Sequence, residues 1–216
     1  METKFELLKR KRFRLALIFF LISFILLTLL VVTGSTRAVE EDITTTIAEG
    51  SRGLLFDCMT YLTYMGDYPF LLPASLAVIF SLYRYNEKAL SIFFGGLMAS
   101  VIPAYKPLKM LIGRPRPELG LASAPGYGYP SGHTVSAFTF FMGLYVFYQV
   151  LYREENDVLI FSICAALASI VGISRLILGV HLPTDVLGGI LLSGVLITSF
   201  SIGYKKGHKK LEHYLS

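Results

Sequence analysis

Two histidines stand beside residues that could make an imidazole reactive. His181 precedes Pro183 and Asp185, and if a helix begins at the proline, the carboxylate lies in its first turn near the imidazole. A carboxylate that holds one ring nitrogen fixes the tautomer and directs the other nitrogen's lone pair at a substrate. A surface histidine beside a helix-start aspartate is also common, so this pair alone leaves both interpretations open.

The second histidine follows Pro130-Ser131-Gly132 and opens a long apolar run. Ser131 is a natural N-cap, and the free amides of Gly132 and His133 would form an anion-binding helix start. Gly132 also lets the backbone approach a ligand closely. An ordinary helix cap with an interfacial His133 is the alternative that these residues alone favour.

Cations accompany both histidines. Arg175 lies six residues before His181, and another cluster runs from Lys109 through Arg114 and Arg116 to Pro117. Arginine presents a planar fork suited to phosphate oxygens, and lysine adds a compact charge. A single cation at a membrane edge could instead contact lipid headgroups, but the prolines restrict where these guanidinium groups point.

The composition indicates a membrane protein. Of 216 residues, 54% are hydrophobic and only 16% are charged, against about 25% charged in soluble domains. Apolar runs of membrane-spanning length predict an all-α fold, a single domain over residues 1–216 that contains six transmembrane helices. Their expected ranges are Leu15–Val32, Tyr68–Leu82, Ala89–Tyr105, Thr134–Tyr152, Val158–Ile173 and Val186–Tyr204. Pro73 and Pro103 predict local kinks.

The basic residues predict the orientation. Most of the 20 lysines and arginines fall in the N-terminal segment, the C-terminal segment and the loops around Arg84 and Arg153, which the positive-inside rule places in the cytoplasm. Both termini are then cytoplasmic, in a multi-pass cell membrane protein. Because each span reverses the side of the membrane, the same orientation brings all three polar clusters to the outer, extracytoplasmic face.

The segment Thr33–Asp67 predicts two short amphipathic helices on the outer surface. Val39, Ile43 and Ile47 recur every four residues among acidic side chains, and a similar apolar stripe begins at Leu54. The stripe fits either packing against the bundle or a lid at a lipid entry.

Several classes of function are disfavoured. The net charge of +5 resides at span ends and in the polar clusters, without a basic helix that would suggest nucleic-acid binding. Cys58 and Cys164 lie in different environments, so neither a disulfide nor a metal spacing is expected. Apart from Asp185, Glu118 is the one carboxylate in the motif segments, and we expect no metal or other cofactor. No obligate protein partner is evident.

Together the three clusters resemble a known signature. Lys109-x6-Arg116-Pro117, Pro130-Ser131-Gly132-His133 and Ser174-Arg175-x5-His181-x3-Asp185 are similar to the tripartite motif of the type 2 phosphatidic acid phosphatase family. The resemblance implies that His181 is the nucleophile, oriented by Asp185, and that His133 is the general acid and base. It also implies a phosphate-binding set of Lys109, Arg116, Ser131, Gly132 and Arg175. Arg114 fits the same strip but lies outside the core signature.

The resemblance further implies hydrolysis of a membrane lipid phosphate through a phosphohistidine. Small bacterial six-span members of the family act on phosphatidylglycerophosphate, phosphatidic acid or undecaprenyl pyrophosphate. Of these, phosphatidylglycerophosphate and undecaprenyl pyrophosphate are the leading substrate candidates for this chain. A flippase for anionic lipids would also place cations near a bundle mouth, but it would need neither His133 nor the His181–Asp185 pair. A vanadate-binding haloperoxidase would share the site residues, although such relatives are usually soluble.

Overall fold

The computed structural model describes residues 4–117, 119, 124–152 and 157–215, so Glu118 and Arg153 lie outside the described residues. In the described part the chain is helical and contains no strand. The elements are α1 (Lys4–Thr33), α2 (Arg37–Gly50), α3 (Leu54–Leu62), the 3-10 helix η1 (Thr63–Gly66), α4 (Tyr68–Arg84), α5 (Lys88–Ile112), α6 (Gly132–Tyr152), α7 (Val158–Ile177) and α8 (Pro183–Leu215).

The expected spanning helices are all present, and each runs longer than predicted. Five helices are long and apolar enough to cross a membrane: α1, α5, α6, α7 and α8. A sixth crossing is formed only if α3 and η1 are joined to α4, with a bend of 46° between them. The predicted second span therefore corresponds to α4 preceded by a broken segment, and the predicted surface helix at Leu54 is part of that segment.

Local sequence explains where the helices begin and end. Asp67 caps α4 by accepting a hydrogen bond from the Tyr68 amide, which places the bend at this residue. Gly113 ends α5 in the left-handed conformation that favours glycine. The helix passes through Pro103 and continues to Ile112, so Lys109 lies in its last turn. The apolar run alone predicts an end at Tyr105, with Lys109 beyond the helix.

The bundle is held by close packing of apolar and small side chains. One core cluster centres on Phe94, Leu97 and Val171, from α5 and α7, together with α6 side chains. At Gly194 of α8 an added Cβ would collide with the ring of Phe20, so the glycine lets α1 approach α8 closely. These contacts hold the helices whose ends carry the three polar clusters.

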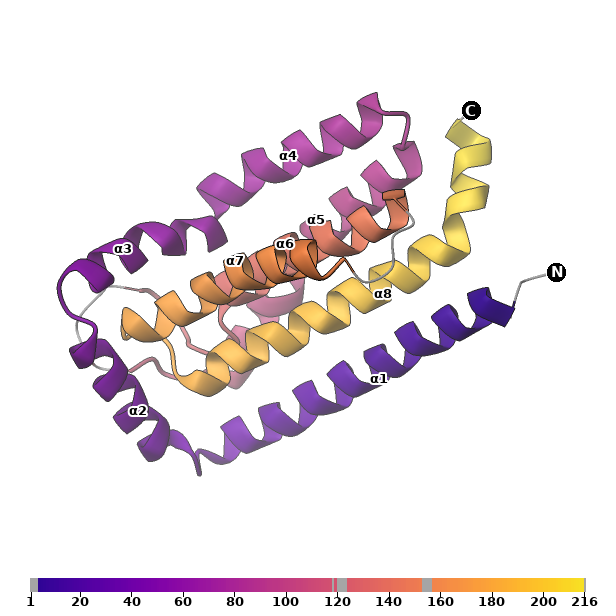
Figure 1. Cartoon of the computed structure of the whole chain (residues 1–216). Helices are drawn as coiled ribbons and strands as arrows, with labels where there is room; N and C mark the ends of the chain where they lie inside the picture. The colour runs from indigo at the N-terminus through magenta and orange to yellow at the C-terminus, as the bar shows by residue number, and fades with distance from the viewer. Residues whose placement is uncertain (1–3, 118, 120–123, 153–156, 216) are drawn as a thin grey trace.

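Helix α2 crosses one end of the bundle, and both chain termini lie at the other end (Figure 1). Its buried residues are Glu40, Thr44 and Ala48, whereas Val39 is 64% exposed and Ile43 is also exposed. Helix α2 thus packs against α7 and α8 as predicted, but not through the stripe of Val39, Ile43 and Ile47, of which Ile47 alone is partly buried. The helix meets the bundle through a face of polar and small side chains, because Glu40 finds hydrogen-bond partners there.

Candidate active site

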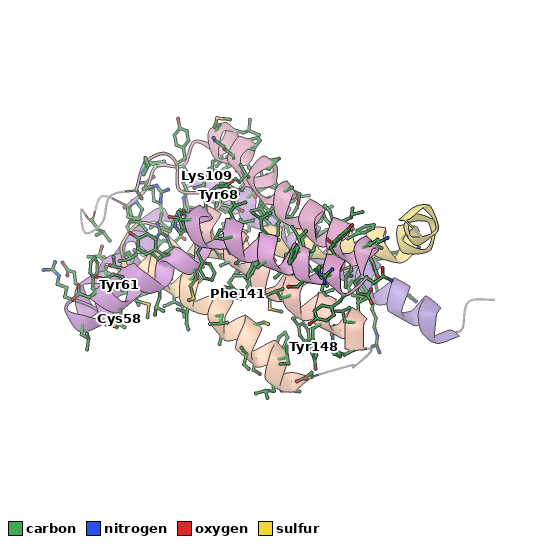
Figure 2. All side chains as sticks on the ribbon, turned by 90° about the horizontal axis from the view of Figure 1, so that it is seen from above. Cys58, Tyr61, Tyr68, Lys109, Phe141 and Tyr148 are labelled. Atoms are coloured by element: carbon green, nitrogen blue, oxygen red, sulfur yellow. The ribbon has the colours of Figure 1, made fainter. Side chains whose placement is uncertain are left out.

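The three polar clusters meet at the end of the bundle that carries α2. Lys109 lies on the side of Cys58 and Tyr61, with Tyr148 toward the opposite end (Figure 2). Backbone hydrogen bonds connect the clusters directly: the Ser131 amide donates to the carbonyl of Asp185 at 2.9 Å, and the Gly128 amide donates to that of Arg114 at 2.7 Å. Segments distant in sequence therefore form one continuous polar centre.

His181 and Asp185 form a buried pair at the start of α8. The imidazole Nδ1 lies 3.1 Å from Asp185 Oδ2, which also accepts the Leu182 amide at 3.0 Å. The other ring nitrogen, Nε2, lies 3.0 Å from Arg116 Nη1. Because arginine is only a donor, Nε2 accepts and Nδ1 carries the hydrogen. This is the tautomer that the sequence predicted for a nucleophile.

The surroundings of His181 keep the imidazole neutral. Its side chain is 1% exposed, and burial lowers the pKa of His181 to about 3, although Asp185 opposes this shift. A neutral imidazole retains the lone pair that nucleophilic attack requires.

Arg116 is fixed over the lone pair of His181. Its Nη1 also donates to the Val180 carbonyl at 2.8 Å, and its Nε donates to the Gly126 carbonyl at 3.0 Å. These carbonyls are uncharged, so the guanidinium keeps its full positive charge for an anion. The Pro-rich segment thus aims one arginine at the His181 imidazole.

Lys109 and Arg175 are likewise held by neutral partners. Lys109 Nζ donates to the carbonyls of Tyr127 and Gly128 at 2.7 and 3.1 Å. Arg175 Nη1 donates to Thr63 Oγ1 at 2.8 Å, and its buried Nε has no hydrogen-bond partner. In the described part of the chain neither residue forms an ion pair with a carboxylate. With Arg116 they supply three unneutralised cations.

The first turn of α6 supplies the second histidine. His133 Nε2 lies 3.9 Å from Asp67 Oδ2, and the charges of Arg175, Arg116 and Lys109 all act on its imidazole. The side chain is partly exposed, in contrast to that of His181. His133 is therefore close to the cations and open to solvent, as proton exchange requires.

Ser131 and Gly132 occupy the positions expected from the sequence. Helix α6 begins at Gly132, and the buried Ser131 precedes it. A Cβ on Gly132 would come within 3.0 Å of the Tyr105 ring, so the glycine is needed for this close approach. Ser131 Oγ accepts the Thr134 hydroxyl at 2.9 Å.

Arg114 differs in its surroundings from the other cations. It donates to Asp185 Oδ1 and to Glu40 Oε2, both at 2.7 Å, and is buried. Glu40, Asp67 and Thr63 are site neighbours that the sequence analysis missed. Glu40 stands in the acidic run Glu40-Glu41-Asp42, which is typical of a solvated face. Only the recurrence of Thr36, Glu40, Thr44 and Ala48 at four-residue intervals could have indicated a buried face.

The arrangement suits phosphoryl transfer. It combines a neutral histidine held by a carboxylate, a second histidine and three cations, which together can offset the negative charge of a phosphate group. Among the described residues, no three His, Cys, Asp or Glu side chains are grouped so that they could hold a metal ion.

Comparisons with known proteins agree with this chemistry. The sequence model of the PAP2 superfamily matches residues 88–208, which include all three polar clusters. Phosphatidylglycerophosphatase B of Bacillus subtilis (strain 168) is 28% identical over 194 residues, covering 87% of this chain and 93% of that protein. The crystal structure of the first transmembrane PAP2 type phosphatidylglycerolphosphate phosphatase from Bacillus subtilis superposes with a TM-score of 0.75 at 25% identity, over 88% of this chain and 96% of that chain. Aquifex aeolicus LpxE superposes with a TM-score of 0.53 at 26% identity, over 75% and 93% of the two chains.

Proposed function

The chain belongs to the PAP2 superfamily, and from this premise we propose that it hydrolyses a lipid phosphate or pyrophosphate through a phosphohistidine on His181. It is a multi-pass membrane protein and a phosphatase of the lipid phosphatase class. The proposal concerns the intermediate, the roles of the site residues, the preferred lipid and the side of the membrane.

The observation that carries the proposal is the geometry around His181. Asp185 Oδ2 lies at 3.1 Å from Nδ1, and the lone pair of Nε2 faces Arg116 at 3.0 Å. A phosphoryl group bound to Arg116 would therefore lie next to the attacking nitrogen. A transporter has no need for this alignment.

The first step would form one bond and break one. The Nε2 lone pair of His181 attacks phosphorus, and the phosphorus–oxygen bond to the lipid breaks, with its electron pair leaving on that oxygen. His133 gives the oxygen a proton, which produces a free lipid alcohol or lipid monophosphate. Asp185 stabilises the positive charge that develops on the imidazole.

The second step would return the enzyme to its starting state. His133, now neutral, takes a proton from water as the water oxygen attacks phosphorus. The bond to Nε2 breaks, its electron pair returns to that nitrogen, and inorganic phosphate is released. Lys109, Arg116 and Arg175 hold the equatorial oxygens in both steps, assisted by Ser131 and the Gly132 amide. Three cations against a phosphate charge of about −1.5 to −2 support binding without assistance from a metal ion.

The substrate is proposed from the membrane setting and from the relatives. A polar centre at the end of spanning helices can receive a phosphate whose lipid tail remains in the bilayer. One relative is named a phosphatidylglycerophosphatase, which favours phosphatidylglycerophosphate as the first candidate. Undecaprenyl pyrophosphate and phosphatidic acid are the other candidates.

We place the site at the extracytoplasmic face because the opposite end of the bundle carries both termini with their basic residues. Asp42 is exposed on α2, at the end that carries the site, so Asp42→Cys in a Cys58→Ser background provides a test. A membrane-impermeant maleimide added to intact cells should label this cysteine. Labelling only after the cells are permeabilised would reverse the orientation.

Phosphate release by purified protein on a panel of lipid phosphates and pyrophosphates tests the activity. We expect release from at least one lipid, and none from His181→Ala; release retained by His181→Ala would remove this residue from the nucleophile role. Rapid quenching with a radiolabelled substrate should trap an acid-labile, base-stable phosphoprotein, as expected of phosphohistidine. EDTA should leave turnover unchanged.

A further inference from the structure

Glu40 is a buried carboxylate whose two oxygens are fully occupied. Oε1 accepts the Thr184 amide at 2.8 Å and the Thr184 hydroxyl at 2.6 Å. Oε2 accepts Arg114 Nη2 at 2.7 Å and the Thr36 hydroxyl at 2.8 Å. The residue is 5% exposed, although its neighbours in the acidic run are partly or fully exposed. So many partners fix its position closely.

Arg114 and Thr184 extend this contact to the His181–Asp185 pair. Arg114 Nη1 lies 2.7 Å from both Thr184 Oγ1 and Asp185 Oδ1. Asp185 Oδ2 then faces His181 Nδ1. An unbroken series of hydrogen bonds therefore runs from α2, through the guanidinium, to the imidazole. Each of the carboxylate oxygens of Asp185 has a defined partner, so rotation of its side chain is restricted.

The charges in this series also matter. Arg114 lies between two carboxylates, so its positive charge is shared and Asp185 is not fully neutralised. Burial would raise the pKa of Glu40, but hydrogen bonds from Thr184, Thr36 and Arg114 outweigh it and lower the pKa, so Glu40 is ionised. Without the negative charge of Glu40, Arg114 would pair with Asp185 alone and weaken its support for a cationic imidazole.

We propose that Glu40 is a positioning residue of the active site, acting through Arg114 and Thr184 to hold Asp185 in the orientation and charge state that His181 requires. This inference rests on the proposed function, since it assigns Glu40 to the same reaction. It gives α2 a role in catalysis and assigns Arg114 to the support of the nucleophile instead of to phosphate binding.

The competing explanation is that Glu40 only fastens α2 to the bundle. A purely structural contact would change the unfolding temperature and leave the turnover of folded protein unchanged. A positioning residue would lower kcat and leave KM nearly unchanged, because Lys109, Arg116 and Arg175 still hold the phosphate. The ratio of the two effects therefore separates the explanations.

The test compares Glu40→Gln with Glu41→Gln, in full-length protein in detergent with a lipid phosphate as substrate. Glu41 is the adjacent residue and pairs with Arg37 at the surface. Its substitution removes the same charge, so Glu41→Gln is a matched control. We expect Glu40→Gln to lower kcat roughly 10- to 100-fold, on the scale of a nucleophile misplaced by up to about 1 Å. Glu41→Gln should behave as wild type.

A milder variant guards against misfolding. Thr184→Val removes the hydroxyl between Arg114 and Glu40 and leaves both charges and the Thr184 amide contact in place. It should lower kcat roughly 3- to 10-fold, as loss of one or two hydrogen bonds would. If Glu40→Gln does not fold, this variant decides: an unchanged kcat would overturn the inference.

The route through Arg114 is tested by combining variants. If Glu40 acts through Arg114 and Thr184, then once Arg114→Gln is present Glu40→Gln should lower kcat by no more than the roughly 3- to 10-fold expected of the Thr184 route alone. Multiplicative losses, an unchanged kcat in folded Glu40→Gln, or a raised KM alone would each contradict the inference. Failure of the wild type and of every variant to release phosphate would instead overturn the proposed function.

Discussion

The contact between Gly128 and Asp185 makes a quantitative prediction about positioning. A Cβ built on Gly128 would lie 2.8 Å from Asp185 Oδ2, whereas ordinary Cβ contacts begin at 3.4 Å. In Gly128→Ala the carboxylate must therefore move by about 0.6 Å. It cannot do so freely, because Oδ2 is bonded to His181 and Leu182 and Oδ1 to Arg114.

The expected consequence is a loss of turnover without a loss of binding. Since a misplacement of 1 Å can cost about 10²-fold, a movement of 0.6 Å should lower kcat roughly 10- to 20-fold. KM should change less than kcat, because Lys109 keeps its shorter hydrogen bond, to the Tyr127 carbonyl, and Arg116 and Arg175 are held by other residues. The assay is steady-state phosphate release, with Gly50→Ala as control, since its Cβ would meet nothing within 4 Å. Wild-type kcat in folded Gly128→Ala would refute the reasoning that the position of Asp185 limits catalysis.

Three further predictions concern charges around the site. His181 stays neutral in the fold to a pKa of about 3, whereas an unfolded histidine protonates near 6.5, so stability should fall as pH drops below 6.5, by up to about 1.4 kcal/mol per pH unit. Thermal unfolding of wild type and His181→Gln between pH 7 and 4.5 measures this contribution, and parallel curves would contradict it. Asp67→Asn removes the carboxylate beside His133 and should lower kcat roughly 3- to 10-fold with a changed pH–rate profile; an unaltered profile would exclude Asp67 from proton transfer. Arg116→Lys keeps the charge but loses the planar guanidinium, whose Nη1 contacts both Val180 and His181 while its Nε is held by the Gly126 carbonyl. The value of kcat/KM should therefore fall roughly 100-fold, and full activity would show that charge alone suffices.

The fold was largely predictable from the sequence because membrane-spanning helices are specified locally. A run such as Leu15–Val32 must form its own hydrogen bonds in lipid, so length and hydropathy identify it without knowledge of its neighbours. The broken segment before α4 was not foreseen as part of a crossing. Its bend depends on Asp67 as a cap and on packing of Gly66 against α6 and α7, where a Cβ would meet the His133 carbonyl and Val171.

The sequence identified residues that the structure gathers at one end of the bundle, but not how those residues pair. Counting spans was enough to bring Lys109, His133 and His181 to one end, because each crossing reverses the side of the membrane. That Arg114 pairs with carboxylates while Arg116 faces the His181 imidazole could not be predicted from two arginines separated by one proline.

What the sequence determined by itself is therefore the set of helices, their alternation across the bilayer and the chemistry of the residues at their ends. Only the tertiary structure decided which charges neutralise each other. Glu40 lies 74 residues before Arg114, the cation with which it pairs, and the acidic run around it is typical of a solvated face. The four-residue recurrence from Thr36 to Ala48 could indicate that Glu40 is buried, but it could not indicate the partners of Glu40, because Arg114 and Thr184 are brought to it only by tertiary packing.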